Sequence, residues 1–370
     1  MQTTDKTDRA DQADQADEST LLRLAQSGDS RAFDELAEAY RSELRAHCYR
    51  MLGSVHDAED ALQDAMLRAW KGLSGFAGRG TVRAWLYSIA TNTALDLATH
   101  RSRRELPTDF GPSAAPGADF DVAAADVLWL EPYPDQWLTP AAFDHAASAP
   151  EALYEQRESI ELAFIVALQH LPPLQRAVLL LREVVGLSTA EISAQLDTSP
   201  QSVNSALQRA RASVRDQRPE MSQQATLARL GEQRIVAIVQ QYVEAMEQGD
   251  VDTLISMLTA DASWSMPPFP TWFQGEEAVR AFLTSGPKRE VWQHATTRAN
   301  GQVAVGGYLL DSATGIFEPW VIDVLTFEGE KIGAVTAFLA AEAADPPRDP
   351  SWISGADLFT RFGLSPIWGS

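Results

Sequence analysis

The sequence predicts a multidomain protein: two all-α domains, the second a helix-turn-helix, followed by an α+β domain. Apolar residues recur every three or four positions in two separate stretches, which is typical of amphipathic helices. After the second stretch, one more helical pattern leads into runs of β-branched and aromatic residues. The 370 residues are enough for two or three domains. The predicted boundaries are a disordered acidic tail over 1–19, a helical domain over 20–104, a linker over 105–157, a helix-turn-helix domain over 158–218, a short linker over 219–231, the α+β domain over 232–345 and a C-terminal tail over 346–370.

Charge and cysteine content narrow the class of protein. The chain has 51 acidic and 30 basic residues, a net charge of −21, which argues against nonspecific nucleic-acid or membrane binding by the whole surface. A single cysteine, Cys48, excludes an internal disulfide and Cys-rich metal sites. No apolar run reaches the roughly 18–20 residues of a membrane span, and the N-terminus lacks a signal-peptide pattern. We expect a cytoplasmic protein without metal, cofactor or membrane contact.

The first helical domain contains an acidic helix and a basic one. The helix that begins near Ser54 carries Asp57, Glu59, Asp60 and Asp64, which fits either a solvated face or a docking face for a basic partner. The next helix begins at Thr81 and has a basic balance over residues 83–104. Its bases and neighbouring polar or aromatic residues suit single-stranded nucleic acid: Arg83, Trp85, Asn92, Arg101, Arg103 and Arg104. Trp85 also fits the apolar stripe of the helix, where it would pack in the core.

The linker after the first domain is acidic but unusually aromatic. From Glu105 to Gln156 there are ten acids and no Lys or Arg. The segment Trp129–Trp137 holds two Trp and one Tyr, which purely solvated linkers rarely contain. We expect it to dock on a neighbouring domain; the alternative is an aromatic cluster without consequence.

The second helical domain ends in a helix with one apolar and one polar face. Ser188 and Glu191 form a capping-box pair, and Ser199 precedes a proline at the first position of the last helix. A short helix, a turn and a longer helix form the helix-turn-helix pattern. The apolar seam of the last helix is Val203, Leu207, Ala210 and Val214. Amides, hydroxyls and arginines lie on or beside the other face, where they could read base edges and bind phosphates: Gln201, Asn204, Ser205, Gln208, Arg209, Arg211 and Arg215. A solvated surface helix would also explain this polarity.

In the α+β domain, a helix over 235–246 precedes β-rich segments, with a hairpin turn at 328–330. Large apolar side chains could line a ligand pocket or simply form the core: Trp264, Met266, Phe269, Trp272 and Trp292. Asp323 shares a strand face with apolar residues, which suggests a raised pKa or a partner, with His294 as a candidate. Catalytic acid–base work, ligand sensing and an ordinary cross-strand polar pair all remain open.

Taken together, the helical segments resemble extracytoplasmic-function sigma factors. The resemblance rests on Asp57–Trp70, Trp85–Asn92, Leu171–Val178 and Ser202–Arg211, and it covers about residues 20–104 and 158–216. The linker and C-terminal extension resemble those of the SigG-type subgroup, whose extension is SnoaL-like, with an NTF2-like cone fold. Tyr242–Met246, Trp264–Pro268 and Ala337–Leu339 carry this looser likeness. The chain departs from the family at Gln201–Ser202 and Ala206, so the family's −35 preference does not transfer.

The resemblance implies partners and roles for the residues. Asp57, Asp60, Gln63 and Asp64 would contact the β′ clamp helices of core RNA polymerase, and the second domain its β flap. The basic helix named above would hold the −10 element of promoter DNA as an opened strand, with a base pocket at the loop 76–80. The helix-turn-helix would bind the −35 element through Ser199, Gln201, Ser202, Asn204, Ser205, Gln208, Arg209, Arg211 and Arg215. This half would not be an enzyme, because the polymerase performs the chemistry.

Two hypotheses address the C-terminal domain. In the first, it regulates the sigma domains by docking, with or without a small-molecule ligand, in place of or beside a separate anti-sigma protein. The linker Trp129–Trp137 and the tail Asp357–Leu364 would make the contacts. In the second, the domain is an isomerase- or cyclase-like enzyme that the DNA-binding half localises. Its ligand-pocket candidates are Trp264, Met266, Phe269, Trp272, Trp292, His294 and Asp323.

Overall fold

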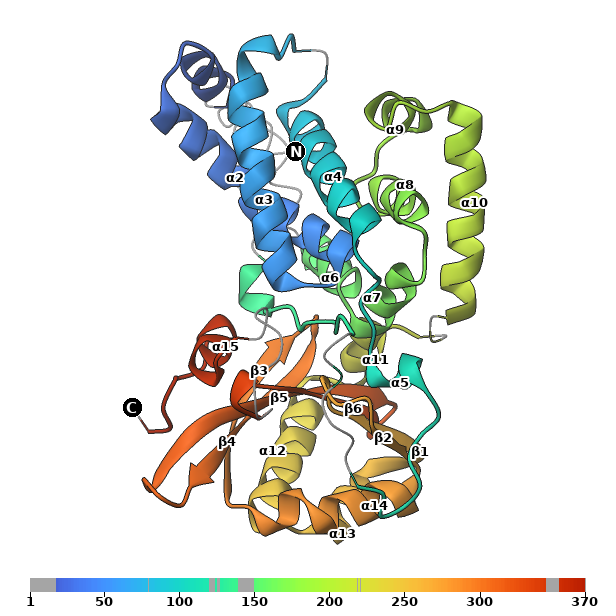
Figure 1. Cartoon of the computed structure of the whole chain (residues 1–370), viewed down its shortest axis with the longest axis vertical. Coiled ribbons are helices and arrows are strands. Elements are labelled where there is room, and N and C mark those ends of the chain that lie inside the picture. The colour runs from blue at the N-terminus through green and yellow to red at the C-terminus, as the bar shows by residue number, and fades with distance from the viewer. Residues whose placement is uncertain are drawn as a thin grey trace, which may run out of the picture. The chain divides into compact units, whose positions relative to one another are not determined.

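The structure is a computed structural model of the whole chain, shown in Figure 1. It describes residues 18–78, 80–119, 124, 127–138, 150–217, 219, 221–343 and 353–369. Most of the predicted N-terminal tail, part of the predicted first linker and the start of the C-terminal tail lie outside the described residues.

The chain divides into two compact units, each built from two separate segments. The first comprises Met1–Arg103 and Trp137–Arg218, and the second comprises Arg104–Gln136 and Pro219–Ser370. The described part of the predicted linker therefore belongs with the C-terminal domain as far as Gln136, and with the helical unit from Trp137.

The first unit is all helical. A helix over 18–26 precedes α2 (Ser30–Leu52), α3 (Val55–Gly72), the short η1 (Leu73–Gly75), α4 (Val82–His100), α6 (Pro150–Glu158), α7 (Leu162–Gln169), α8 (Pro173–Glu183), α9 (Thr189–Gln195) and α10 (Pro200–Gln217). Local signals fix several ends: Asp29 caps α2, Gly53 ends it with φ 70°, and Ser54 caps α3. The predicted capping box of Ser188 and Glu191 is confirmed at the start of α9.

Buried polar bonds join the two halves of this unit. The Arg176 guanidinium on α8 donates to the Met51 carbonyl at the end of α2 and to the carbonyls of Gln169 and Leu171. Arg50 on α2 donates to the Ser159 hydroxyl at 2.6 Å. Because a buried guanidinium must have its donors satisfied, these bonds fix the packing of α2 against α7 and α8.

The second unit is an α+β domain with one six-stranded sheet in the order β2-β1-β6-β5-β4-β3. Strands β1 and β6 are parallel, and the other neighbours are antiparallel. The elements are α5 (Pro107–Phe110), α11 (Gln223–Leu230), α12 (Glu232–Gln248), α13 (Val251–Met257), β1 (Leu258–Ser265), β2 (Trp272–Gln274), α14 (Glu276–Ser285), η4 (Pro287–Arg289), β3 (Trp292–Ala299), β4 (Gln302–Asp311), β5 (Ile316–Glu328), β6 (Lys331–Leu339), η5 (Ala341–Ala343) and α15 (Gly355–Arg361). The short η2 (Asp135–Trp137) spans the division between the units.

The two faces of the sheet are covered by different parts of the chain. Helices α12, α13 and α14 pack on one face around Tyr242, Trp264 and Phe282 (Figure 1). On the other face lies α15, since a side chain at Gly306 would meet Phe359 and Leu364. The tail therefore belongs to this domain.

The linker also docks on this domain. Tyr133 is fully buried, and its N–H donates to Asn300 Oδ1 at 2.8 Å. The Ala114 N–H donates to the carbonyl of Trp272, whose indole N–H donates to the Gly111 carbonyl. The expected docking of the aromatic segment is thus observed. Residues 223–230, inside the predicted second linker, form helix α11 instead.

Candidate functional site

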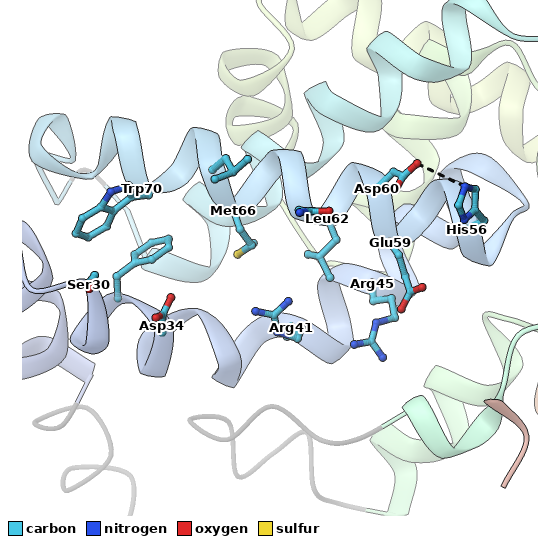
Figure 2. Close-up of a pocket in the computed structure, with 13 residues that line it drawn as sticks. Ser30, Asp34, Arg41, Arg45, His56, Glu59, Asp60, Leu62, Met66 and Trp70 are labelled. Carbon is cyan, nitrogen blue, oxygen red and sulfur yellow. Dashed lines mark ion pairs between the residues drawn. The ribbon is translucent and has the colours of Figure 1, made fainter. Parts of the chain in front are cut away.

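A groove lies between α2 and α3 in the helical unit. It has a volume of about 680 Å³ (Figure 2). Leu62, Met66 and Trp70 of α3 line it, with Phe33 of α2 against Trp70 at a ring distance of 5.2 Å. Leu67, at the rim, is 53% exposed. The groove thus presents apolar side chains that a partner could bury on binding.

Charged side chains stand around these apolar groups. Arg41 and Arg45 of α2 and Glu59 and Asp60 of α3 line the same end of the groove (Figure 2). His56 lies 3.8 Å from Asp60. Both signs of charge are therefore available to a partner that carries charges beside an apolar stripe.

The four residues predicted to bind polymerase divide into three groups. Asp60 and Gln63 are exposed and line the groove. Asp64 is exposed on the next turn but does not line it. The Asp57 side chain is only 5% exposed and forms an ion pair with Arg101, so it holds the end of α4 against the start of α3.

In α4, the predicted DNA contact Arg83 is engaged inside the unit. Its guanidinium donates to both Glu43 oxygens at 2.8–3.1 Å and to the Val185 carbonyl at 3.4 Å. It also lies 4.9 Å from the centre of the Tyr87 ring, and the Tyr87 hydroxyl donates to Glu43. Burial is the main reason that the pKa of Tyr87 is raised.

The other predicted residues of this cluster are scattered. Arg103 lies 2.7 Å from His170 Nδ1. Arg104 belongs to the second unit, where it is buried and donates to the Trp129 carbonyl and to Glu131. Trp85 is half-buried against Phe76, at a ring distance of 5.0 Å, and Asn92 is half-buried further along α4. Each of the four predicted arginines of this cluster thus already has a partner in the structure.

Helix α10 has the two faces that the sequence predicts. Val203, Leu207, Ala210 and Val214 are all at most 7% exposed, so the predicted seam is confirmed. The other side carries the predicted reading residues. Gln201, Ser202, Asn204, Gln208, Arg209, Arg211 and Arg215 are exposed, and Ser205 is half-buried.

Several of these side chains already have partners. Ser199 Oγ accepts from the Ser202 N–H at the start of the helix. Asn204 accepts from the Thr189 hydroxyl on α9 at 3.4 Å. Arg211 forms an ion pair with Glu183 on α8. These contacts orient α10 within the helix-turn-helix, and no ion pair is recorded for Arg209 or Arg215 among the described residues.

In the C-terminal domain, some of the predicted pocket residues are buried in the core and others are half-buried outside it. Trp264, Met266 and Trp292 belong to the hydrophobic core and are at most 8% exposed. Trp272 and Phe269 are half-buried outside it, and the linker bonds to Trp272. The structure therefore favours a core role for the first three.

Asp323 has a partner that sequence analysis did not identify. The Tyr242 hydroxyl on α12 donates to Asp323 Oδ2 at 2.9 Å, and both groups are buried. Burial raises the pKa of Asp323 to about 7, although the bond from Tyr242 opposes that shift. The pattern of α12 marks Tyr242 as a core residue, but a sequence does not show which strand faces its hydroxyl.

His294 was the candidate partner of Asp323, and the structure places it elsewhere. Its Nδ1 is 3.7 Å from Glu247 Oε1, and its backbone N–H donates to that carboxylate at 2.9 Å. Neither ring nitrogen has a hydrogen-bond partner among the described residues. Burial lowers the pKa of His294 to about 4, so the ring is neutral at pH 7.

Neither a metal-ligand cluster nor a membrane span occurs among the described residues. No group of three or more His, Cys, Asp or Glu side chains there could hold a metal ion. No helix among those residues combines the length and apolar character of a membrane span.

Comparison with known proteins identifies the family of the chain. Residues 36–104 match Sigma-70 region 2, residues 161–214 match Sigma-70 region 4, and residues 239–335 match the SnoaL-like domain. The chain is 41% identical over 340 residues to the ECF RNA polymerase sigma factor SigG of Mycobacterium tuberculosis, covering 90% of this chain and 84% of that protein. It is 29% identical over 194 residues to the ECF RNA polymerase sigma-E factor of Escherichia coli, covering 52% of this chain and 90% of that protein.

A solved structure shows the same fold over most of the chain. The crystal structure of the Mycobacterium tuberculosis extracytoplasmic function sigma factor SigJ aligns with a TM-score of 0.53 and 22% identity, covering 90% of this chain and 99% of that one. The matched regions, their order and the identity to SigG over nearly the whole chain lead to one conclusion. The chain belongs to the extracytoplasmic-function (ECF) RNA polymerase sigma factors.

Proposed function

We propose that this protein binds core RNA polymerase and directs promoter-specific initiation of transcription, and that its C-terminal domain modulates this activity. The observation that carries the proposal is that region 2 (residues 36–104) and region 4 (residues 161–214) both occur, in order, in a chain 41% identical to a sigma factor over 90% of its length.

The groove between α2 and α3 supports polymerase binding in region 2. Its apolar floor and its charges of both signs suit an amphipathic helix such as the β′ clamp helices. Asp60 and Gln63 stand at the groove and are exposed, so they can meet the partner without unfolding the domain. Asp57 would act indirectly, by holding Arg101.

The exposed side of α10 supports reading of the −35 element as duplex DNA. Its amide side chains suit base edges in the major groove, and its arginines suit phosphates. Region 2 would hold the −10 element as an opened strand. Arg101 and Arg103 are exposed and could contact it beside their present partners, whereas the half-buried Arg83 and the buried Arg104 would have to loosen theirs.

The docked linker supports control by the C-terminal domain. The segment 104–136 connects the two sigma regions in sequence, and described residues of it, such as Tyr133, bond to the second unit to which the segment belongs. A change in this domain, caused by a small ligand or by a separate anti-sigma protein, would thus reach the chain between regions 2 and 4. Burial of Asp323 and Tyr242 against each other favours a structural pair over an acid–base catalyst.

The first test compares two charge reversals in the full chain. Asp60→Lys places a cation at the groove, whereas Glu35→Lys places one at an exposed site of α2 outside it. We expect Asp60→Lys to weaken binding to core polymerase at least tenfold, because misplaced charges at an interface cost several kcal/mol. Glu35→Lys should bind as the unchanged protein does. Affinity is measured by titration with core enzyme, and initiation by mapping start sites on a genomic promoter pool.

Equal loss in both variants would remove the groove from the binding surface while leaving the sigma assignment intact. If the unchanged protein neither binds core polymerase nor initiates anywhere in the pool, the proposed function is wrong.

A further inference from the structure

The turn between β3 and β4, Asn300-Gly301, differs from ordinary hairpin turns in being buried. Both residues have positive φ, 53° and 69°, as a two-residue turn of this type requires. Connections of this kind normally lie in water. Here Asn300 is 0% exposed, and its neighbour Gly301 is buried too. Something must therefore cover this turn and satisfy its polar groups.

The linker covers one side of it. Asn300 N–H donates to the Tyr133 carbonyl, and the Tyr133 N–H donates back to Asn300 Oδ1, both at 2.8 Å. The Gly301 N–H donates to Asp135 Oδ1 at 2.7 Å. Arg298 Nε reaches the other oxygen of Asp135 at 3.3 Å. The linker and the turn thus satisfy each other's buried backbone groups.

Helix α11 follows region 4 in the sequence, whereas the linker precedes it, and α11 bonds to the same turn. Gln224 Nε2 donates to the Gly301 carbonyl at 2.6 Å. The neighbouring Gln223 donates to the Phe327 carbonyl and accepts from the Phe327 N–H, as a strand partner would. Both glutamines are at most 6% exposed, so α11 is fixed to the sheet by buried bonds.

The C-terminal tail closes the arrangement. Thr297 Oγ1 on β3 donates to the Phe362 carbonyl at 2.7 Å. Gln136, next to Asp135, donates to the carbonyls of Thr360 and Arg361 at the end of α15. Linker, turn and tail thereby form one bonded group within the second unit.

The sequence positions of these contacts give them a shared consequence. Region 4 begins after Asp135 and ends before Gln224. The segment before region 4 and the segment after it therefore each contain a residue that bonds to the same glycine, Gly301. Region 4 is a loop of the chain closed at both ends on one hairpin turn.

We propose that the Asn300-Gly301 turn is a clasp through which the C-terminal domain sets the reach of region 4 on promoter DNA. This inference rests on the proposed sigma function. While the clasp is closed, the linker segment 104–136, which has 33 residues, belongs to the second unit and cannot lengthen the connection between regions 2 and 4. When it opens, a free chain of that length has an end-to-end distance of about 30 Å and can stretch further. The closed clasp would thus restrict the spacing between −35 and −10 elements that the protein accepts.

Two variants of the full chain open the clasp without changing the sigma regions. Asn300→Gly keeps a residue that tolerates positive φ and removes the side chain that accepts from the Tyr133 N–H. Asp135→Ala removes the partner of Gly301 and Arg298. The matched control is Asp311→Ala, in the β4–β5 turn, because that carboxylate caps its own turn at Ala313 and Thr314.

Two measurements test the proposal. We expect amide hydrogen exchange over residues 129–136 to be about tenfold faster in Asn300→Gly and Asp135→Ala, since each lost buried bond shifts local opening by roughly that factor. We also expect initiation on promoters with longer or shorter spacers to rise relative to the optimal spacer. Asp311→Ala should match the unchanged protein in both measurements.

The results separate the clasp from the proposed function. Unchanged exchange over 129–136 in both variants would show that the turn does not hold the linker. Faster exchange with an unchanged spacer profile would show that the clasp does not control reach. Both results overturn the inference, whereas absence of initiation by the unchanged protein would instead contradict the sigma function.

Discussion

Asp323 shows how a single buried group ties the stability of the C-terminal domain to pH. Its carboxyl group is enclosed by the sheet and by α12 and accepts one bond, from Tyr242. Its pKa is raised to about 7 by burial, whereas an aspartate in an unfolded chain titrates near 3.9. Between these values the folded domain binds the extra proton, so its stability falls as pH rises from about 4 to 7.

Asp323→Asn should remove this dependence, because the amide stays neutral at every pH. We expect the variant to gain on the order of 4 kcal/mol over the unchanged protein at pH 8, and nothing at pH 4. The measurement is the urea midpoint of the second unit, followed by hydrogen exchange across β5. His294 has the opposite sign, since its lowered pKa makes protonation destabilising below about pH 6. A gain that is the same at pH 4 and pH 8 would show that Asp323 does not titrate as described.

At the scale of the element, α10 separates residues that orient the helix from exposed residues that have no ion pair among the described residues. Arg211 is bound to Glu183, and Asn204 to Thr189, whereas Arg209 is exposed and has no recorded ion pair among the described residues. A phosphate contact by Arg211 would compete with Glu183 for the same guanidinium, and this competition offsets part of the gain.

This difference predicts two salt dependences of promoter binding. Arg209→Ala should lower the slope of log affinity against log salt by about 1, as expected for one lost phosphate contact. Arg211→Ala should lower it by less, since Glu183 already neutralises that charge. Binding of the full chain with core polymerase to one promoter is titrated at several salt concentrations. Equal slopes for both variants would mean that the Glu183 pair does not persist on DNA.

Elements with strong local signals could be predicted from the sequence, and elements held by distant partners could not. The seam of α10 and the capping box of α9 depend on residues three or four positions apart. The hairpin turn predicted at 328–330 lies between β5 and β6, where Glu328 pairs with Lys331. Helix α11 was missed because its fixed position depends on Gln223 and Gln224, whose partners lie about a hundred and about eighty residues later. The α2/α3 groove was only half predicted, since the acidic residues of α3 gave no sign of Arg41 and Arg45.

At the scale of the whole molecule, the second unit is not continuous in sequence. Its linker segment supplies Leu130 and Tyr133, which are buried, and the sheet that buries them is made from later residues. The aromatic composition of the segment predicted that it would dock. Its partner could not be predicted, because a cluster of Trp and Tyr indicates burial but not which surface provides it.

Removal of residues 219–370 should therefore expose the linker as well as delete a domain. We expect chymotrypsin to cleave after Trp129 at least a hundredfold faster in the truncated chain than in the full one, because Trp129 is buried and its segment is held by the bond between Tyr133 and Asn300. Cleavage at each site is followed by mass spectrometry; trypsin has no site in this segment, which lacks Lys and Arg between Glu105 and Gln156. Equal rates would show that the second unit does not protect Trp129.

The bond between Tyr133 and Asn300 joins residues 167 positions apart, so it cannot form until long after Tyr133 has been synthesised. At about 5–20 residues per second, the ribosome makes Asn300 roughly 8–33 s after Tyr133. Region 2 is complete before Tyr133 is made, and region 4 is completed within that interval, while the sheet that will hold the linker is still unfinished. Every new molecule thus passes through a period in which its promoter-reading half is present and its restraint is still being translated.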